Sequence, residues 1–206
     1  MMVKPNESSK FACVLFLRNV GGSELANLKV SLRETPNLRI LHQSDLTGRI
    51  IAPGSNVEYK MLLGVRDITR PQSMSGSVDY ATSLPFVINI PCSTFVLPTK
   101  ISLDEFSELI NSSMRGAAAT LHHVFAACNV SVAPQELMQW ICSNLHVIPV
   151  HSVDNTASLY GKTTQDHHVL LLVKHQPSSF RVDIRCSDAT MSSSLLEEIT
   201  NHFKSS

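Results

Sequence analysis

Two pairs of adjacent histidines are the first residues that could perform chemistry: His122 with His123, and His167 with His168. Each pair lies in a stretch predicted to be extended, where successive side chains point to opposite faces of a strand. Neighbouring imidazoles therefore diverge and cannot easily coordinate one ion together. The sequence also lacks the HExxH, GxSxG, P-loop and GxGxxG motifs. We expect no metal, no cofactor and no catalytic activity.

The five cysteines do not change this expectation. Their odd number and the absence of a CxxC pair argue against a disulfide framework and against a zinc module. Neither Cys142, beside an apolar helical stripe, nor Cys186, on the apolar side of a strand, has the cationic setting that activates a thiol. Each cysteine is expected to pack as a small apolar residue. The five are Cys13, Cys92, Cys128, Cys142 and Cys186.

The composition excludes some partners. Of 206 residues, 43% are hydrophobic and 17% are charged, with a formal net charge of zero. Without a basic block, neither nucleic acid nor an anionic membrane is a natural electrostatic partner. The longest apolar run, "VLLLV", is too short to span a bilayer, and the start "MMVKPNESSK" has no apolar leader core. We expect a cytoplasmic setting without direct membrane insertion, with residues 1–9 as a linker.

Residues 10–96 are predicted to form an immunoglobulin-like antiparallel β-sandwich. "LANLKVSLRE" and "VEYKMLLGVR" alternate between apolar and polar residues, and "NVGGSE" and "APGSN" are turn sequences. Six or seven such short strands with regular turns are typical of a sandwich. The pattern changes between Pro91 and Ile101, where we place a junction between two subdomains.

Residues 97–206 are predicted to form an α+β platform, a small antiparallel sheet with about three helices. A capping box of Ser102 and Glu105 begins the first helix, whose apolar side contains Leu103, Phe106, Leu109 and Ile110. Pro134 begins the second helix. A second possible capping box, Ser194 with Glu197, lies at the last helix. Residues 114–133 are read as one or two strands.

Two strands of the platform have contrasting patterns. "HVLLLVK" is apolar at every central position, so both of its faces should be covered. "FRVDIRC" alternates, which puts Phe180, Val182, Ile184 and Cys186 on a buried side and Arg181, Asp183 and Arg185 on a wet side. Arg181 and Arg185 could therefore meet acidic residues of a partner, although such charges are also commonly only solvated.

Trp140 is the one residue that breaks its local pattern. It is the single tryptophan, and it lies roughly 130° from the centre of its helix's apolar stripe, on the side of Glu136 and Asn144. A large aromatic away from the core side could anchor a partner. Alternatively, Trp140 packs under a neighbouring strand or loop. The predicted protein-binding residues are therefore Trp140, Glu136, Asn144, Arg181 and Arg185.

Three stretches, "ASLYGKT", "DHHVLLLVK" and "CSDATMSSSLLEEI", carry a family resemblance. Their order and spacing are similar to those at the C-terminal end of the δ-adaptin family, the large subunits of third adaptor-protein complexes, and they cover about a quarter of the chain. The resemblance implies an appendage, or ear, domain on a flexible hinge of a vesicle coat, peripheral on Golgi and endosomal membranes. Ears of this kind recruit accessory or tethering proteins, including lysosomal or vacuolar tethers, through short peptide motifs.

One departure concerns the motif pocket. In the ears of the plasma-membrane adaptor, a tryptophan late in the first platform helix lines this pocket, whereas here the region offers Leu109 and Ile110. We therefore expect another binding surface than the one used for DPF-type motifs. A structural or autoregulatory domain that docks onto the other subunits of its own adaptor complex is the alternative function. A hydrolase that uses Cys142 or a histidine is a third, disfavoured one.

Overall fold

The computed structural model describes residues 9–114 and 121–204. Its backbone contacts separate two compact units. The described part of the first unit covers residues 9–67 and 72–90, and that of the second covers residues 68–71, 91–114 and 121–204. None of the helices in the described ranges is long and apolar enough to cross a membrane.

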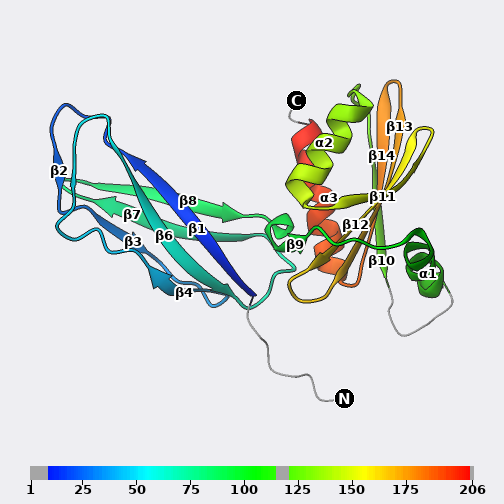
Figure 1. The fold of residues 1–206 in the computed structure, drawn as a ribbon, viewed down its shortest axis with the longest axis horizontal. Helices are drawn as coiled ribbons and strands as arrows, with labels where there is room; N and C mark the ends of the chain where they lie inside the picture. Colours follow the sequence, from blue (N-terminus) through cyan, green and yellow to red (C-terminus); the bar gives the residue numbers. More distant parts are fainter. Residues whose placement is uncertain (1–8, 115–120, 205–206) are drawn as a thin grey trace, which may run out of the picture. The chain divides into compact units, whose positions relative to one another are not determined.

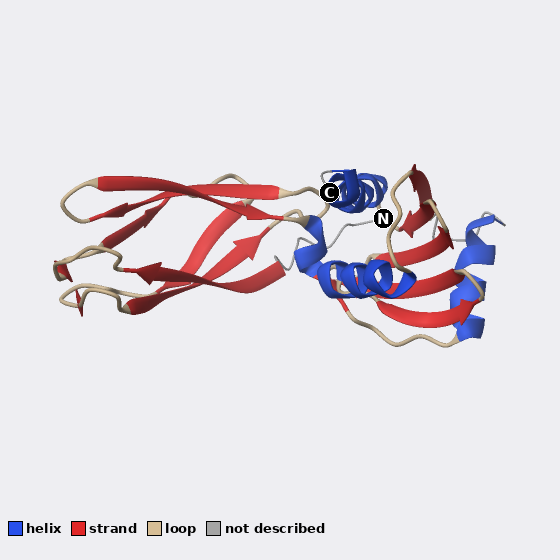
Figure 2. Ribbon diagram, turned by 90° about the horizontal axis from the view of Figure 1, so that it is seen from above, coloured by secondary structure: helices blue, strands red, loops and turns tan. Residues whose placement is uncertain are grey.

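The first unit is built only from antiparallel strands, which form two layers (Figure 2). The two three-stranded sheets have the orders β1-β6-β4 and β3-β7-β8, and β2 pairs with β5. The strands are β1 (Ser9–Arg18), β2 (Leu25–Ala26), β3 (Lys29–Leu32), β4 (Leu38–Gln43), β5 (Ile50–Ile51), β6 (Asn56–Val65), β7 (Gln72–Asp79) and β8 (Ser83–Ile90).

The central strand β6 shows why this sequence forms a sandwich. Val57, Tyr59 and Met61 are buried, whereas Glu58 and Lys60 between them are exposed. This period of two puts Val57, Tyr59 and Met61 on the face that packs against the other layer. The predicted alternation in "VEYKMLLGVR" is confirmed.

The second unit is a sheet with helices on both faces (Figure 1). Five strands follow the order β10-β14-β13-β12-β11, and β9 also pairs with β12. The elements are η1 (Cys92–Phe95), β9 (Val96–Leu97), α1 (Leu103–Met114), β10 (His122–Cys128), α2 (Pro134–Leu145), β11 (Ile148–Val153), β12 (Thr156–Thr163), β13 (His168–Gln176), β14 (Ser179–Cys186) and α3 (Ala189–Lys204). The predicted fold class, a β-sandwich followed by an α+β platform, is confirmed.

The strand β13 is covered on both faces, as its continuous apolar run predicts. Val169 and Leu171 pack in the large core beneath α2 and α3. Leu170 and Leu172 pack in a smaller core with Phe106 of α1. The sheet of the second unit therefore has an α2/α3 face and an α1 face, which lie on opposite sides of the strands in Figure 1.

The helix α1 begins with the predicted capping box. The backbone N–H of Glu105 donates to the Ser102 hydroxyl at 3.2 Å, and the backbone N–H of Ser102 donates to the Glu105 carboxylate at 2.9 Å. Phe106, Leu109 and Ile110 pack on the α1 face of the sheet. Leu103 was expected to join them but is 45% exposed, because it lies in the first turn, beyond the sheet residues that the helix covers.

The start of α3 differs from the prediction. The helix begins at Ala189, and the carboxylate of Asp188 caps it by accepting a hydrogen bond from the Met191 N–H at 2.8 Å. The capping box expected at Ser194 and Glu197 is therefore wrong. Ser194 lies inside the helix, and its hydroxyl donates to the Thr69 carbonyl at 3.3 Å. Asp188 offered a cap one and a half turns earlier.

Candidate functional site

The five predicted contact residues lie on opposite faces of the sheet in the second unit. Trp140, Glu136 and Asn144 belong to α2, which packs on the α2/α3 face. Arg181 and Arg185 belong to β14 and alternate with residues that face α2 and α3, so their side chains lie on the α1 face. The structure therefore separates them into two groups rather than one site.

The indole of Trp140 is half-buried against α3. It stacks on the His202 ring, with the ring centroids 4.2 Å apart and the planes at 16°. The edge of Phe203 approaches it at 5.1 Å between centroids. The Asn144 amide donates to the Trp140 carbonyl at 2.9 Å, and Glu136 is exposed in the first turn of α2. Packing on α3 explains why a large aromatic lies away from the apolar stripe; its role as a partner anchor stays a prediction.

A pocket of about 360 Å³ lies beside Trp140 and also contains Glu198. The Glu198 carboxylate accepts a hydrogen bond from the Cys92 N–H at 2.7 Å, and burial raises the pKa of this carboxyl. A ring nitrogen of His146 donates to the Ser93 carbonyl at 2.9 Å. These polar groups join α2 and α3 to η1, so they explain local structure without leaving a group free for a ligand.

The other group surrounds Asp183 on the α1 face. The Arg181 guanidinium donates two hydrogen bonds of 2.8 Å to the Asp183 carboxylate, and the His123 ring lies 3.0 Å from the same carboxylate. The hydrogen bond from Arg181 is the main cause that lowers the pKa of Asp183, which is therefore ionised at neutral pH. Residues sixty positions apart meet here because β10 pairs with β14.

Phe125 completes this group as an exposed aromatic. Its side chain is 58% exposed, and the Arg181 guanidinium lies 4.2 Å from the ring centroid in a cation–π contact. The His123 ring also stacks on the Phe125 ring, with the ring centroids 5.9 Å apart. Sequence reasoning named neither Phe125 nor His123 as a contact residue, although in "HHVFAAC" they alternate with Val124, which packs against the apolar core. That alternation was the available signal.

Two further cations belong to the neighbouring strands, Arg185 to β14 and Lys174 to β13. The Arg185 Nε atom is buried and has no hydrogen-bond partner among the described residues. Lys174 is exposed on β13 and lies in register with Arg181. Among the described residues of β10, β13 and β14, Asp183 is the only acidic side chain beside Arg181, Arg185 and Lys174, so these strands carry net positive charge here. We call it the open face, defined by His123, Phe125, Lys174, Arg181, Asp183 and Arg185.

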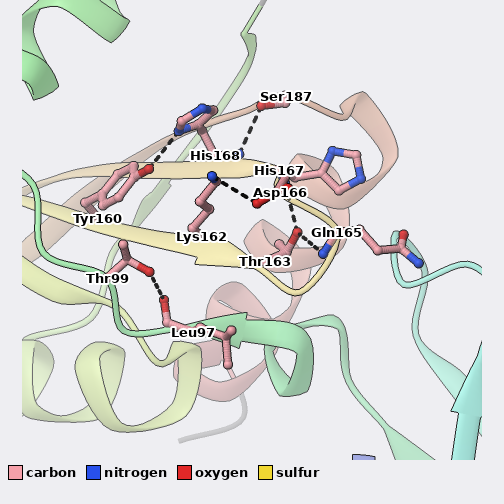
Figure 3. Close-up of polar contacts among 10 residues, drawn as sticks. All are labelled: Leu97, Thr99, Tyr160, Lys162, Thr163, Gln165, Asp166, His167, His168 and Ser187. Carbon is pink, nitrogen blue, oxygen red and sulfur yellow. Dashed lines mark hydrogen bonds and ion pairs between the residues drawn. The ribbon is translucent and has the colours of Figure 1, made fainter. Parts of the chain in front are cut away.

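The other end of the α1 face holds a polar pocket of about 480 Å³ (Figure 3). The Tyr160 hydroxyl lies 2.7 Å from Nδ1 of His168. Burial raises the pKa of Tyr160 and lowers the pKa of His168, so both are uncharged at neutral pH and share one hydrogen bond. Lys162 pairs with Asp166 at 2.9 Å. This ion pair engages Lys162, one of the charged residues that line the pocket.

The histidine pair in this region does not form a ligand set. Figure 3 shows His168 directed toward Tyr160 and His167 directed away from it. Across residues 9–114 and 121–204, no group of three or more His, Cys, Asp or Glu side chains could hold a metal ion. The imidazoles of His167 and His168 diverge as expected, although only His168 lies in a strand and His167 precedes it in the loop.

The cysteines are thiols in the structure. All five are free, and three of them, Cys92, Cys128 and Cys186, are buried as expected, whereas Cys13 and Cys142 are only half-buried. Burial raises the pKa of Cys186 to about 11 and also raises the pKa of Cys142. Neither thiol is ionised at neutral pH, which is the opposite of what a nucleophile needs.

The first unit presents a chemically different surface. A groove of about 840 Å³ is lined mainly by apolar residues of β1 and β8, with Arg18 as the single charged residue of its lining. Phe16 and Val87 of this lining are 71% and 61% exposed. All five contact residues predicted from the sequence belong instead to the second unit.

Comparison with known proteins identifies relatives of both units. A family model described as the AP3 Mu C-terminal domain matches residues 93–204, which is most of the second unit. The chain is 25% identical over 209 residues to the AP-3 complex subunit delta-1 of Bos taurus. It is 21% identical over 200 residues to the AP-3 complex subunit delta of Dictyostelium discoideum. Each alignment covers 94% of this chain and 17% of the relative.

Proposed function

Because the chain belongs to the AP3 Mu C-terminal domain family and is an AP-3 delta appendage-like domain, we propose that it recruits accessory or tethering proteins to an adaptor coat. It is an adaptor-complex domain, and it spans about a sixth of the length of the relatives it matches. We propose that it acts in membrane traffic from endosomes or the Golgi toward lysosomes. The rest of the complex would hold it on the membrane surface from the cytoplasmic side.

The open face is the observation that supports this proposal. It combines an aromatic that is 58% exposed, Phe125, with the guanidinium of Arg181, whose side chain is 47% exposed. Exposed aromatics and arginines are the residue types that contribute most to protein–protein binding.

The charge of the open face selects the kind of partner. Arg181, Arg185 and Lys174 outnumber Asp183, so a peptide rich in Asp or Glu is favoured over a basic one. A short peptide covers only a small surface and binds weakly, roughly in the micromolar range. Many appendages on one coat would then raise the overall avidity.

Docking onto other subunits of the same adaptor complex remains the alternative function. The open face would then hold an acidic segment of a neighbouring subunit rather than of an accessory protein. A separate contact at Trp140, Glu136 and Asn144 is the second proposed surface, because the edge of the half-buried indole borders a pocket on α2.

The test is quantitative capture of proteins from cytosol on the immobilised chain. Four forms are compared: the native chain, Arg181→Gln with Arg185→Gln, Trp140→Ala, and a matched control in the sandwich, Lys10→Gln with Lys60→Gln. We expect the arginine pair variant to lose at least about tenfold of specifically captured accessory proteins, because charge-assisted contacts are lost. The lysine control should capture them normally.

Each outcome has a distinct meaning when the variants melt at the native temperature. If only Trp140→Ala lost the captured accessory proteins, the recruiting surface would be the one on α2. Capture of adaptor subunits only would favour the docking alternative. Full capture by both the arginine and the tryptophan variants would refute recruitment through the second unit.

A further inference from the structure

The strand β10 forms one edge of the platform sheet. It pairs with β14, and no other described strand lies on its outer side. The same sheet ends at β11 on the other side. An edge strand carries backbone N–H and C=O groups that can bind another extended segment. The two edges of this sheet differ in how well they are protected.

The direction of the hydrogen bonds in the sheet identifies which groups of β10 point outward. The Ser187 N–H donates to the His168 carbonyl at 3.2 Å, so this pair is hydrogen-bonded between β14 and β13. Alternate residues of an antiparallel strand bond to the same neighbour. Arg185, Asp183 and Arg181 therefore bond to β13, and the residues between them bond to β10.

The register transfers this alternation to β10. Ile184 lies opposite Val124 and Val182 lies opposite Ala126, so the backbone groups of Val124 and Ala126 point toward β14. The backbone groups of His123, Phe125 and Ala127 point outward. The side chains of these same three residues are exposed and lie on the open face.

In the described part of the chain, the edge at β11 has protecting features that the edge at β10 lacks. β11 contains Pro149, and its pairing with β12 shifts register between Pro149 and His151. Proline and bulges are devices that prevent edge pairing. β10 has the sequence HHVFAAC, without proline or lysine, and its pairing with β14 runs without a register shift.

The charges beside β10 select its occupant. The Arg181 guanidinium lies over Phe125 of β10 itself, and Arg185 lies in register with His123. A second copy of the chain on this edge would bring a second positively charged open face next to the first, which is unfavourable. An acidic extended peptide would place carboxylates beside them.

We propose that an acidic peptide of a partner protein adds to the platform sheet as an extra strand along the outer edge of β10. The inference rests on the proposed recruiting function and specifies its binding mode. The backbone of the peptide bonds to His123, Phe125 and Ala127, and every second side chain lies over the open face beside Arg181 and Arg185. The remaining side chains point to the side of α3, where Val124 and Cys128 pack in the core.

The experiment measures the fluorescence anisotropy of a labelled probe peptide, Glu-Val-Glu-Phe-Glu-Val-Glu, with the full chain. Two N-methylated forms of the probe carry methyl groups on alternate backbone nitrogens. One form is methylated at its Glu residues, and the other at the Val and Phe residues between them. Only one of the two sets of N–H groups points to β10 in an added strand. We expect one methylated form to lose at least about tenfold in affinity through lost hydrogen bonds, and the other to bind within about twofold.

Two protein variants test the same edge from the other side. Ala127→Pro removes an outward N–H that β14 does not use, and Ala127→Val keeps it. We expect about a tenfold loss with proline and no loss with valine. A probe in which Lys replaces Glu should bind at least about tenfold more weakly, because it faces the arginines.

The contrary outcomes separate this inference from the recruiting function. Binding that depends on Arg181 and Arg185, but is equally sensitive to both methylation patterns and indifferent to Ala127→Pro, would overturn strand addition and leave recruitment intact. Absence of probe binding to the native chain would also overturn it, while the cytosol capture decides recruitment independently. A dimer of the free chain in sedimentation, abolished by Ala127→Pro, would show that a second copy occupies the edge and would refute the peptide.

Discussion

The two faces of the platform sheet differ in how completely helices cover them. The α2/α3 face is closed: Ile184, Leu171 and Ile199 are fully buried in one apolar core. The α1 face is covered over β11, β12 and β13, whereas no described residue covers it over β10 and β14, where Phe125 and Arg181 are exposed. Strands that alternate in sequence can therefore stabilise the fold with one side and present chemistry with the other.

The difference also shows where stability and binding are separated. Side chains on the closed face are held by packing, which is sensitive to the loss of single methylene groups. Those on the open face are held by hydrogen bonds and one cation–π contact at the surface, which contribute little to folding. Substitutions on the two faces should therefore have opposite consequences for stability and for partner capture.

The largest expected effect is a cavity on the closed face. Ile184→Ala should lower the free energy of unfolding by about 2–5 kcal/mol, because Ile184 is fully buried. Phe125→Ala on the paired strand should change it by no more than about 0.5 kcal/mol. Urea denaturation of both variants measures the contrast. Equal losses would mean that the open face is a second core rather than a binding surface.

A smaller loss of stability is expected from adding a methyl group where the core is already tightly packed. A Cβ added to Gly161 would lie 2.7 Å from Cγ1 of Val96 and 3.1 Å from Cγ1 of Val147. Gly161→Ala should therefore cost about 1–3 kcal/mol through overpacking. Ala127→Val on the open face adds more volume but meets solvent, and should cost less than about 0.5 kcal/mol. Thermal melts that rank Ala127→Val as the worse variant would contradict the difference between the faces.

The smallest effect concerns the ion pair of the open face. Asp183→Asn should cost about 0.5–1 kcal/mol at neutral pH, since solvent screens the pair. The pKa of Asp183 is lowered by its hydrogen bond from Arg181, so its contribution is present above the ordinary carboxyl range and is lost as the pH falls through its folded value. The deficit of the variant should thus shrink below about pH 4. If the loss of stability in Asp183→Asn grew as the pH fell, the Asp183 carboxylate would not stabilise the fold in the way described.

Much of the fold could be predicted because it is encoded locally. The alternation of "FRVDIRC" placed Ile184 and Arg185 on opposite sides of a strand, and the capping box placed the start of α1. Asp188 was overlooked because a later Ser–Glu pair also fits the capping pattern. The division into residues 10–96 and 97–206 stays a proposal, which expression of the platform by itself would test.

The candidate site could be predicted only in part, because pairing between distant strands is not visible in local patterns. Arg181 was identified from its own strand, but its contact with Phe125 depends on β10 lying beside β14. Trp140 was identified from its helical phase, but its stacking on His202 depends on how α2 packs against α3. Helical phase locates a side chain on its own helix and says nothing of the neighbouring helix.

The most direct test of the open face as the docking surface is NMR titration of the isotope-labelled chain with the acidic probe. The account predicts that the amide signals of His123, Phe125 and Ala127, with those of Arg181 and Arg185, shift together and saturate with one affinity. The signals of α2, including the indole of Trp140, should stay in place. Shifts confined to α2 and α3, with β10 and β14 unchanged, would contradict the account.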